Sequence, residues 1–215
     1  MENNVILLPA KNEAKSIGRV IDDIRLSGFN NIVVAASGCT DNTTSVASEH
    51  GALVLGDAPC GKGRAINYAL KRISADKIVM LDADCTYPAK SIPDFILALD
   101  HCDVVAGVRQ FNVNNISTIG RWGNKFISWQ ARRLYNIPIK DLCTGMWGFK
   151  GNAIKNIEIE SYGFTLEAEL FVYANKKKLA FLQIPIEYYP RIGTCKINRL
   201  DHLKIMWYLW TRSLT

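Results

Sequence analysis

Ile78-Val79-Met80-Leu81-Asp82-Ala83-Asp84 is a run of four apolar residues followed by two carboxylates one residue apart. The apolar run predicts a buried strand, and ligands of open α/β sheets bind at the carboxyl ends of parallel strands. Two carboxylates there suit Mg²⁺ or Mn²⁺ carrying a diphosphate, because such ions bind through a few carboxylates plus substrate phosphates. An acidic turn at a strand end would have the same sequence. The rest of the chain therefore has to distinguish the two interpretations.

Strands and helices alternate along the first half of the chain. Short apolar runs predict strands at residues 5–8, 32–36, 52–55, 78–81 and 104–106, and Pro9 is expected to end the first. Apolar residues at helical spacing predict helices at residues 17–24, 43–50, 65–73 and 92–99, with Ser16 as the N-cap of the first. This alternation predicts one α/β domain over residues 1–215, with a mostly parallel central sheet and helices on both faces.

The composition limits the class of protein. A chain of 215 residues that is 48% hydrophobic can bury a full core as one domain. No stretch approaches the roughly 18 apolar residues of a membrane span, and Met1-Glu2-Asn3-Asn4 does not look like a signal peptide. The six cysteines include no C-x-x-C pair, which favours reduced thiols in a cytosolic protein. The net charge of +6 favours an anionic partner: a phosphate, a membrane surface or a nucleic acid.

The segments after the first four predicted strands carry groups suited to a nucleotide. They are Pro9-Ala10-Lys11-Asn12-Glu13, Ser37-Gly38-Cys39-Thr40-Asp41-Asn42-Thr43, Gly61-Lys62-Gly63 and Asp82-Ala83-Asp84. Together they offer small residues that let a backbone approach, polar side chains, a cation and a carboxylate pair. Because the carboxyl ends of parallel strands lie at one edge of a doubly wound sheet, we expect the four segments to share one rim.

With these segments the chain resembles the family 2 glycosyltransferases of the GT-A fold. The matching pieces are Leu8-Pro9-Ala10-Lys11-Asn12-Glu13, Gly38-Cys39-Thr40-Asp41-Asn42-Thr43, Gly61-Lys62-Gly63-Arg64-Ala65 and Asp82-Ala83-Asp84. The second half is similar to the dolichyl-phosphate (polyprenyl-phosphate) sugar transferases of that family. The residues that carry this likeness are Val105-Ala106-Gly107-Val108-Arg109, Asp141-Leu142-Cys143-Thr144-Gly145-Met146-Trp147-Gly148-Phe149, Gly163-Phe164-Thr165-Leu166-Glu167-Ala168-Glu169-Leu170 and residues 184–196.

The resemblance implies an inverting transfer of a hexose from a nucleotide-diphosphate sugar, GDP-mannose or a UDP-sugar, to a polyprenyl or dolichyl phosphate. It implies a Mg²⁺ or Mn²⁺ site made of Asp82, Asp84 and Thr86, where relatives often have an amide in place of the threonine. The implied donor-binding residues are Pro9, Ala10, Asn12, Glu13, Ser37, Asp41, Lys62, Asp82 and Ala83. Many relatives carry acids at the positions of Ala36 and Ser37, so the resemblance does not indicate the donor base.

A phosphate acceptor is largely ionised near neutral pH, with a second pKa of about 6, so it needs cations to hold it rather than a base. Arg109, Arg121, Arg191 and Lys196 are predicted to form that cradle, because guanidinium forks match phosphate oxygens. Asp141 and Thr144 are expected to border the acceptor site. The expected catalytic residues are Asp84, Arg109, Arg191 and Lys196.

Glu167 and Glu169 leave a second acceptor class open. A hydroxyl of a saccharide or other glycan would need a general base, and glycan-elongating relatives use an acid in this region. The i, i+2 spacing places the two carboxylates on different sides of a helix. One of them could instead orient an arginine or lysine, or both could be solvated.

Two segments are candidates for contact with a membrane. Ile116, Ile119, Trp122, Phe126 and Trp129 form an apolar stripe at helical spacing, with Arg121, Lys125, Arg132 and Arg133 among them. The tail, about residues 200–215, is rich in Trp and Leu but too short and too charged to span a bilayer. Such helices are typical of a membrane interface, although helices packed on a sheet have similar patterns. The tail could also close over the core or pair with another subunit. We expect a cytoplasmic protein, peripheral on the inner face of a membrane.

A nucleic-acid-binding module is the remaining alternative suggested by the positive charge. It predicts aromatic and basic residues patterned for bases or phosphates. The chain has no such recognised motif, and its carboxylate pair would repel a phosphate backbone. No nucleic-acid partner is therefore expected.

Overall fold

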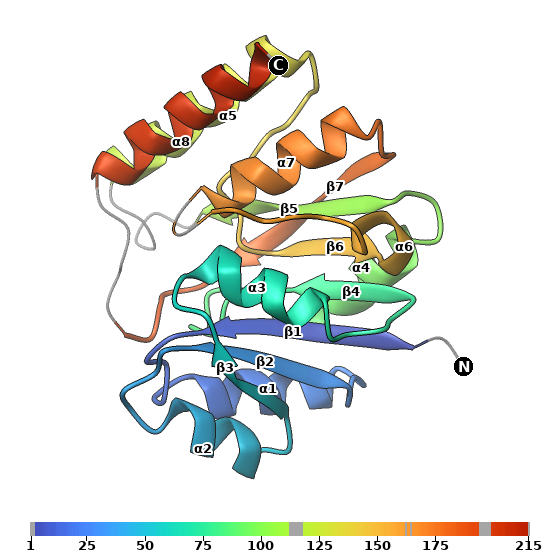
Figure 1. The fold of residues 1–215 in the computed structure, drawn as a ribbon, viewed down its shortest axis with the longest axis vertical. Helices are drawn as coiled ribbons and strands as arrows, with labels where there is room; N and C mark the ends of the chain where they lie inside the picture. The colour runs from blue at the N-terminus through green and yellow to red at the C-terminus, as the bar shows by residue number, and fades with distance from the viewer. Residues whose placement is uncertain (1–2, 112–117, 162, 164, 194–198, 215) are drawn as a thin grey trace.

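The computed structural model describes residues 3–111, 118–161, 163, 165–193 and 199–214 (Figure 1). Its described strands form a seven-stranded sheet of order β3-β2-β1-β4-β6-β5-β7. The strands are β1 (Asn4–Ala10), β2 (Ile32–Ser37), β3 (Leu53–Ala58), β4 (Lys77–Met80), β5 (Val104–Phe111), β6 (Trp147–Lys150) and β7 (Phe181–Tyr188). β6 runs antiparallel to both of its neighbours, and every other pairing is parallel. The predicted α/β fold with a mostly parallel sheet is confirmed.

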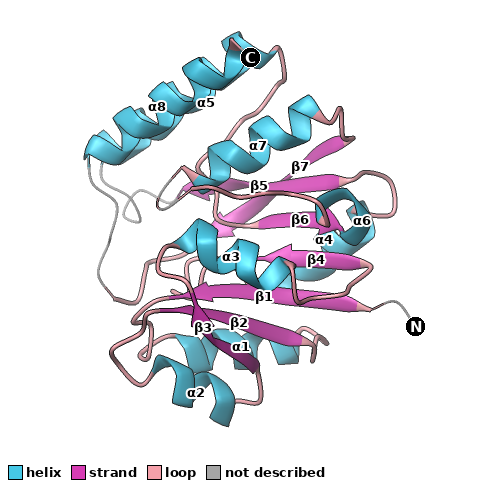
Figure 2. Ribbon diagram, viewed as in Figure 1, coloured by secondary structure: helices cyan, strands magenta, loops and turns pink. Residues whose placement is uncertain are grey.

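Helices lie on both faces of this sheet (Figure 2). They are α1 (Ile17–Leu26), α2 (Thr43–Glu49), α3 (Lys62–Leu70), α4 (Ile92–Ala98), α5 (Thr118–Tyr135), α6 (Gly151–Ile154), α7 (Leu166–Lys176) and α8 (Arg199–Ser213), with a 3₁₀ turn at Ala89–Ser91. Side chains of α1, α2 and α4 pack in one core, and those of α3 and α5 to α8 pack in the other. β1 supplies both cores by alternation, with Val5 and Leu7 in one and Ile6 and Leu8 in the other.

Pro9 lies inside β1 and does not end it, so the predicted strand end at residue 8 is wrong. The carbonyl of Leu7, two residues earlier, accepts from Leu81 N on the β4 side (3.2 Å). Pro9 therefore faces that side as well, because strand residues alternate. The last paired residue of β4 is Met80, opposite Leu7. The missing N–H of Pro9 thus falls beyond the last paired residue of β4.

The start of α3 also differs from the prediction. Lys62 and Gly63 lie in its first turn, not in a loop, because the helix begins three residues before residue 65. Gly61 precedes it with φ of +111°, a conformation that residues with a side chain rarely adopt. Ser16 does stand at the N-terminus of α1 but does not cap it. Its hydroxyl donates to the carbonyl of Ala83 (2.7 Å), which ties α1 to the Asp82–Asp84 segment.

α5 and α8 lie side by side at one end of the molecule, beyond α7 (Figure 1). Gln130 Nε2 donates to Met206 O (3.1 Å), and Tyr135 Oη donates to Leu209 O (2.8 Å). Several large apolar side chains of this pair are exposed: Trp122, Phe126, Trp129, Leu200, Leu203, Trp207 and Trp210; Leu214, just after α8, is exposed as well. Ile116 of the predicted stripe lies outside the described residues, as does the side chain of Ile119. None of the described helices combines the length and the apolarity needed to cross a bilayer.

Candidate active site

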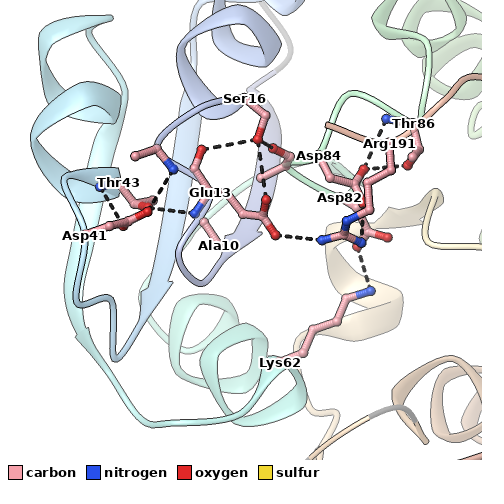
Figure 3. Close-up of polar contacts among 12 residues, drawn as sticks. Ala10, Glu13, Ser16, Asp41, Thr43, Lys62, Asp82, Asp84, Thr86 and Arg191 are labelled. Atoms are coloured by element: carbon pink, nitrogen blue, oxygen red, sulfur yellow. Dashed lines mark hydrogen bonds and ion pairs between the residues drawn. The ribbon is translucent and has the colours of Figure 1, made fainter. Parts of the chain in front are cut away.

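The four strand-end segments do converge on one pocket. Its volume is about 330 Å³, at the lower end of the range for small-molecule sites. The lining residues are Pro9, Ala10, Lys11, Glu13, Ser37, Cys60, Gly61, Lys62, Ala65, Asp82, Ala83, Asp84, Gly163 and Arg191. The sequence-based expectation of a shared rim is therefore met. Figure 3 shows how the polar side chains from these segments approach one another.

Asp82 follows β4 and faces a lysine across the pocket. Lys62 Nζ, at the start of α3, lies 2.7 Å from Asp82 Oδ1 and 2.8 Å from Glu167 Oε1 on α7. Burial favours the neutral amine, but the charges of Asp82 and Glu167 outweigh it and raise the pKa of Lys62 above its usual 10.5. The lysine is therefore a permanent cation that two carboxylates share.

Asp84 is the deeper carboxylate, with only 3% of its surface exposed. Its Oδ1 accepts from Thr86 Oγ1 (2.5 Å) and Thr86 N (3.1 Å), and its Oδ2 lies 2.7 Å from Arg191 Nη1. Burial, with the nearby negative charge of Asp82, raises the pKa of Asp84 above its usual value despite these partners. Two carboxylates whose negative charges repel each other in one pocket are typical of a site that binds a cation.

Arg191 reaches the pocket from the segment after β7. Its Nη2 lies 2.8 Å from Glu13 Oε1, so one guanidinium joins Glu13 to Asp84 (Figure 3). The backbone of this segment is also fixed, because Tyr189 N donates to Thr86 O and Ile192 N donates to Asp84 O, both at 3.0 Å. The C-terminal part of the chain thus completes a site whose carboxylates come from the N-terminal part.

Three predicted donor-binding residues form hydrogen bonds that connect the segments around the pocket. Ser37 Oγ donates to Pro59 O (3.1 Å) and accepts from Gly61 N (2.8 Å), which joins the end of β2 to the start of α3. Asp41 accepts from the hydroxyl and N–H of Thr43 and from Ala14 N. Asn12 pairs with Thr40 through both ends of its amide. Ser37 lines the pocket, whereas Asp41 and Asn12 do not, so contact of these two with a donor remains a prediction.

Thr86, the third predicted metal ligand, lies behind Asp84 in this structure. It is 1% exposed, does not line the pocket, and donates its hydroxyl proton to Asp84. In this structure the Thr86 side chain orients the buried carboxylate of Asp84, and its predicted contact with a metal ion remains a prediction.

The predicted acceptor residues are not gathered in the described part of the site. Arg109 and Asp141 form a buried ion pair, with Nε to Oδ2 at 2.6 Å and Nη2 to Oδ1 at 2.7 Å, so the guanidinium fork already holds a carboxylate. Thr144 is fully buried, and its hydroxyl lies among interior atoms. Arg121 lies on α5 and does not line the pocket. Lys196 lies outside the described residues, which leaves Arg191 as the predicted acceptor cation that the structure places in the pocket.

The two glutamates of α7 have different surroundings, as their spacing predicts. Glu169 is 6% exposed, and its two oxygens accept from Glu160 N (2.8 Å) and Ser161 N (3.0 Å). It fixes the segment before α7 and is not placed to act as a base. Glu167 accepts a hydrogen bond from Lys62 Nζ (2.8 Å). This contact corresponds to one of the roles that the sequence left open, a glutamate that orients a lysine.

The carboxylates present fit a divalent cation. No group of three or more His, Cys, Asp or Glu side chains converges among the described residues. Asp82 and Asp84 nevertheless line one pocket, from the segment that follows β4. Mg²⁺ and Mn²⁺ commonly take one or two protein carboxylates and complete their shell with phosphate oxygens and water. The donor set is therefore the kind used when the substrate brings the remaining ligands.

Sequence reasoning gave no binding role to Gly145, Cys60 or Gly163, although each contributes to the pocket or its wall. Cys60 and Gly163 line it. A Cβ added to Gly145 would lie 2.3 Å from Asp82 Oδ2, so this glycine leaves room for the carboxylate. Only the three-dimensional contact shows which side chain Gly145 accommodates.

Comparison with known proteins identifies the family to which these features correspond. Residues 5–158, more than half of the chain, match the model of glycosyl transferase family 2. The glycosyltransferase AglJ of Haloferax volcanii is 32% identical over 86% of this chain, and the chain spans 63% of its length. A dolichyl-phosphate hexose transferase of the same organism is 30% identical over 90% of the chain and is covered over 86% of its own length.

Solved structures show the same architecture. Glucosyl-3-phosphoglycerate synthase of Mycobacterium tuberculosis, in complex with Mn²⁺, uridine diphosphate and phosphoglyceric acid, superposes with a TM-score of 0.78. The match covers 99% of this chain and 78% of the other, at 21% identity. A second structure of that enzyme holds Mg²⁺ and uridine diphosphate and gives a TM-score of 0.76. At this level of identity the likeness shows a shared GT-A fold.

Proposed function

This chain belongs to glycosyl transferase family 2, and we propose that it transfers a hexose from a nucleotide-diphosphate sugar to a polyprenyl or dolichyl phosphate, with inversion at the sugar carbon. The observation that carries the proposal is the arrangement of Asp82 and Asp84 in one pocket, each paired with a cation that comes from another element. Such a pocket suits a diphosphate, because it offers both metal-binding carboxylates and positive side chains. The dolichyl-phosphate relative, which aligns over most of its own length, supports the lipid phosphate as acceptor.

In the proposed reaction, Asp82 and Asp84 hold Mg²⁺ or Mn²⁺. Such an ion would supply charge neutralisation for the departing diphosphate. Solved structures of the mycobacterial synthase contain these ions together with uridine diphosphate, which supports this assignment by analogy. Thr86 keeps the Asp84 carboxylate in position, and Gly145 keeps the space beside Asp82 open.

Lys62 and Arg191 supply the positive charge of the protein itself. Lys62 is placed at the N-terminal turn of α3, where the helix dipole adds to its attraction for phosphate. Arg191 lines the same pocket, where its guanidinium holds Glu13 and Asp84, and a phosphate oxygen of the leaving diphosphate or the arriving acceptor would share this cation with the two carboxylates. A phosphate nucleophile needs such cations and no general base. The positions of Glu167 and Glu169, both already hydrogen bonded, agree with that requirement.

A membrane surface is the proposed place of reaction. The exposed apolar side chains of α5 and α8 lie on adjacent helices, among the basic residues Lys125, Arg133, Lys204 and Arg212. Aromatic side chains interleaved with cations suit the headgroup region of an anionic bilayer. A lipid-linked acceptor would then present its phosphate from the side of the molecule where this helix pair lies.

An activity screen tests the proposal. Purified protein is offered GDP-mannose, UDP-glucose or UDP-N-acetylglucosamine, with a short polyprenyl phosphate and Mg²⁺ or Mn²⁺, and the products are separated by chromatography. The expected result is metal-dependent transfer of one hexose to the lipid phosphate. Transfer to a free glycan, with none to lipid for any donor, would instead establish the hydroxyl-acceptor alternative.

A further inference from the structure

Lys62 is held by two carboxylates that come from different parts of the fold. Asp82 follows β4, and Glu167 lies in the first turn of α7, 105 positions away from Lys62 in the chain. Both contacts are short, at 2.7 and 2.8 Å, and the Glu167 side chain is only 12% exposed. One ammonium thus bridges a carboxylate that is proposed to bind metal and one that has no assigned role.

We propose that Glu167 is a positioning residue. It keeps the Lys62 ammonium beside the donor diphosphate when Asp82 binds a divalent cation in place of the lysine. This inference rests on the proposed function, because it needs a diphosphate and a metal ion in the pocket. The group that touches the substrate is Lys62, and Glu167 acts through it.

The physical reason is competition for one carboxylate. Lysine carries a compact point charge on a flexible four-carbon stem, so its position depends on its partners. A divalent cation on Asp82 would repel Lys62 from the same oxygens. Glu167 offers the ammonium a second partner that is not a candidate metal ligand, and its low exposure strengthens the attraction. Lys62 can therefore stay in the pocket while Asp82 changes its partner.

The position of Glu167 also argues against a role as general base. One of its oxygens accepts a hydrogen bond from the Lys62 ammonium at 2.8 Å. It is absent from the pocket lining, whereas Lys62 is present. A base must lie within hydrogen-bond reach of the proton that it removes. The described geometry places Lys62 between Glu167 and the pocket.

Titration calorimetry with GDP or UDP in the presence of Mg²⁺ tests the inference without measuring turnover. Glu167→Gln removes a negative charge, so general electrostatics alone would tighten the binding of an anionic nucleotide. Loss of positioning predicts the opposite: roughly tenfold weaker binding, on the scale of one charge-assisted hydrogen bond. Glu158→Gln is the matched control, because it removes the same charge from an exposed residue on the segment before α7. It is expected to bind like the unmodified protein.

A double-mutant cycle identifies the partner. Lys62→Met should weaken nucleotide binding about tenfold or more, and the double variant should bind no more weakly than Lys62→Met alone. Glu167→Asp, which keeps the charge but shortens the side chain, should bind with intermediate affinity. Unchanged affinity in Glu167→Gln, or additive losses in the double variant, would overturn the inference. Failure of the unmodified protein to bind either nucleotide would overturn the proposed function first.

Discussion

Arg191 lies 178 positions after Glu13, yet its Nη2 is 2.8 Å from the Glu13 carboxylate, while its Nη1 is 2.7 Å from Asp84. A planar guanidinium can serve both carboxylates at once, and the single ammonium of a lysine matches that fork poorly. The pairing joins the segments that follow β1 and β7, the first and last of the described strands, at the candidate active site. Because of this geometry, a substitution can test whether position 191 requires arginine rather than lysine.

Replacement of Arg191 by lysine should lower turnover by roughly 10-fold to 100-fold with little change in stability, because the charge stays and the bidentate geometry is lost. Initial rates at varied acceptor and donor concentrations would measure the effect. Arg19→Lys is a suitable control, since Arg19 forms only an exposed pair with Asp23 at 3.7 Å. Equal rates for Arg191→Lys and Arg19→Lys would show that the fork is not needed.

Asp82→Asn and Asp84→Asn should each reduce metal-dependent turnover by about 100-fold or more while the protein remains folded. Each amide keeps the size of the side chain but removes a charge that a divalent cation needs. Activity assays across a Mn²⁺ titration, with circular dichroism to verify folding, would measure this. A double variant with robust activity would contradict the metal role of the pair.

Asp84→Asn should unfold no more easily than the unmodified protein at pH 7. The folded-state pKa of Asp84 is raised above 3.8, so the folded protein binds the proton more tightly than the unfolded chain does. The ionised carboxylate therefore costs folding stability above that pH, and the cost disappears as the pH falls below 3.8. Chemical unfolding of both proteins at pH 7 and near pH 4 would measure the difference. A variant clearly less stable at pH 7 would show that the contacts to Thr86 and Arg191 outweigh the cost of burial.

Gly145→Ala should reduce turnover at least about tenfold without unfolding the protein. The new methyl group would meet Asp82 Oδ2 at 2.3 Å, so the carboxylate would have to move. Displacements of about 1 Å at a reacting site can cost up to about 100-fold in rate. Gly56→Ala is the matched control, because a Cβ there meets nothing within 4 Å. Similar kinetics for the two variants would show that the space beside Asp82 is not required.

Trp122→Glu and Trp207→Glu should weaken binding to vesicles that contain anionic lipid. Both side chains are exposed, at 69% and 65%, and each change replaces an apolar ring with a charge that the bilayer repels. Co-sedimentation with vesicles at low and high salt would measure the loss. Leu97→Glu supplies the control, since Leu97 is 63% exposed on α4, at the other face of the sheet. Equal loss in all three variants would indicate a general effect of charge.

The strand-end segments could be predicted from the sequence because they depend on local patterns. Apolar runs predict the strands, and the rule for parallel sheets predicts that Glu13, Lys62 and Asp82 share one rim. Element boundaries were less predictable. Pro9 lies within β1 because the neighbouring strand ends first, and such a relation between two strands has no local signature.

Partner choice among the charged residues could not be predicted. Arg109 and Arg191 looked alike as candidates for phosphate binding, but Arg109 is buried against Asp141 while Arg191 lines the pocket. Glu167 and Glu169 differ in the same way, since one meets Lys62 and the other meets backbone N–H groups. These differences arise because elements far apart in the sequence pack together. The periodicity of a sequence does not show such contacts.

The backbone bonds from Tyr189 and Ile192 to the Asp84 segment limit how far the site can lie from α8. α8 begins at Arg199, eight positions after Arg191, and eight residues span at most about 28 Å when fully extended. If α8 rests on a lipid surface as proposed, the carboxylates cannot be farther from that helix than this length allows. The phosphate of a carrier lipid would then have to reach from the bilayer surface to the carboxylates within this length. The distance between Asp84 and the bilayer is therefore a property of the enzyme that can be measured.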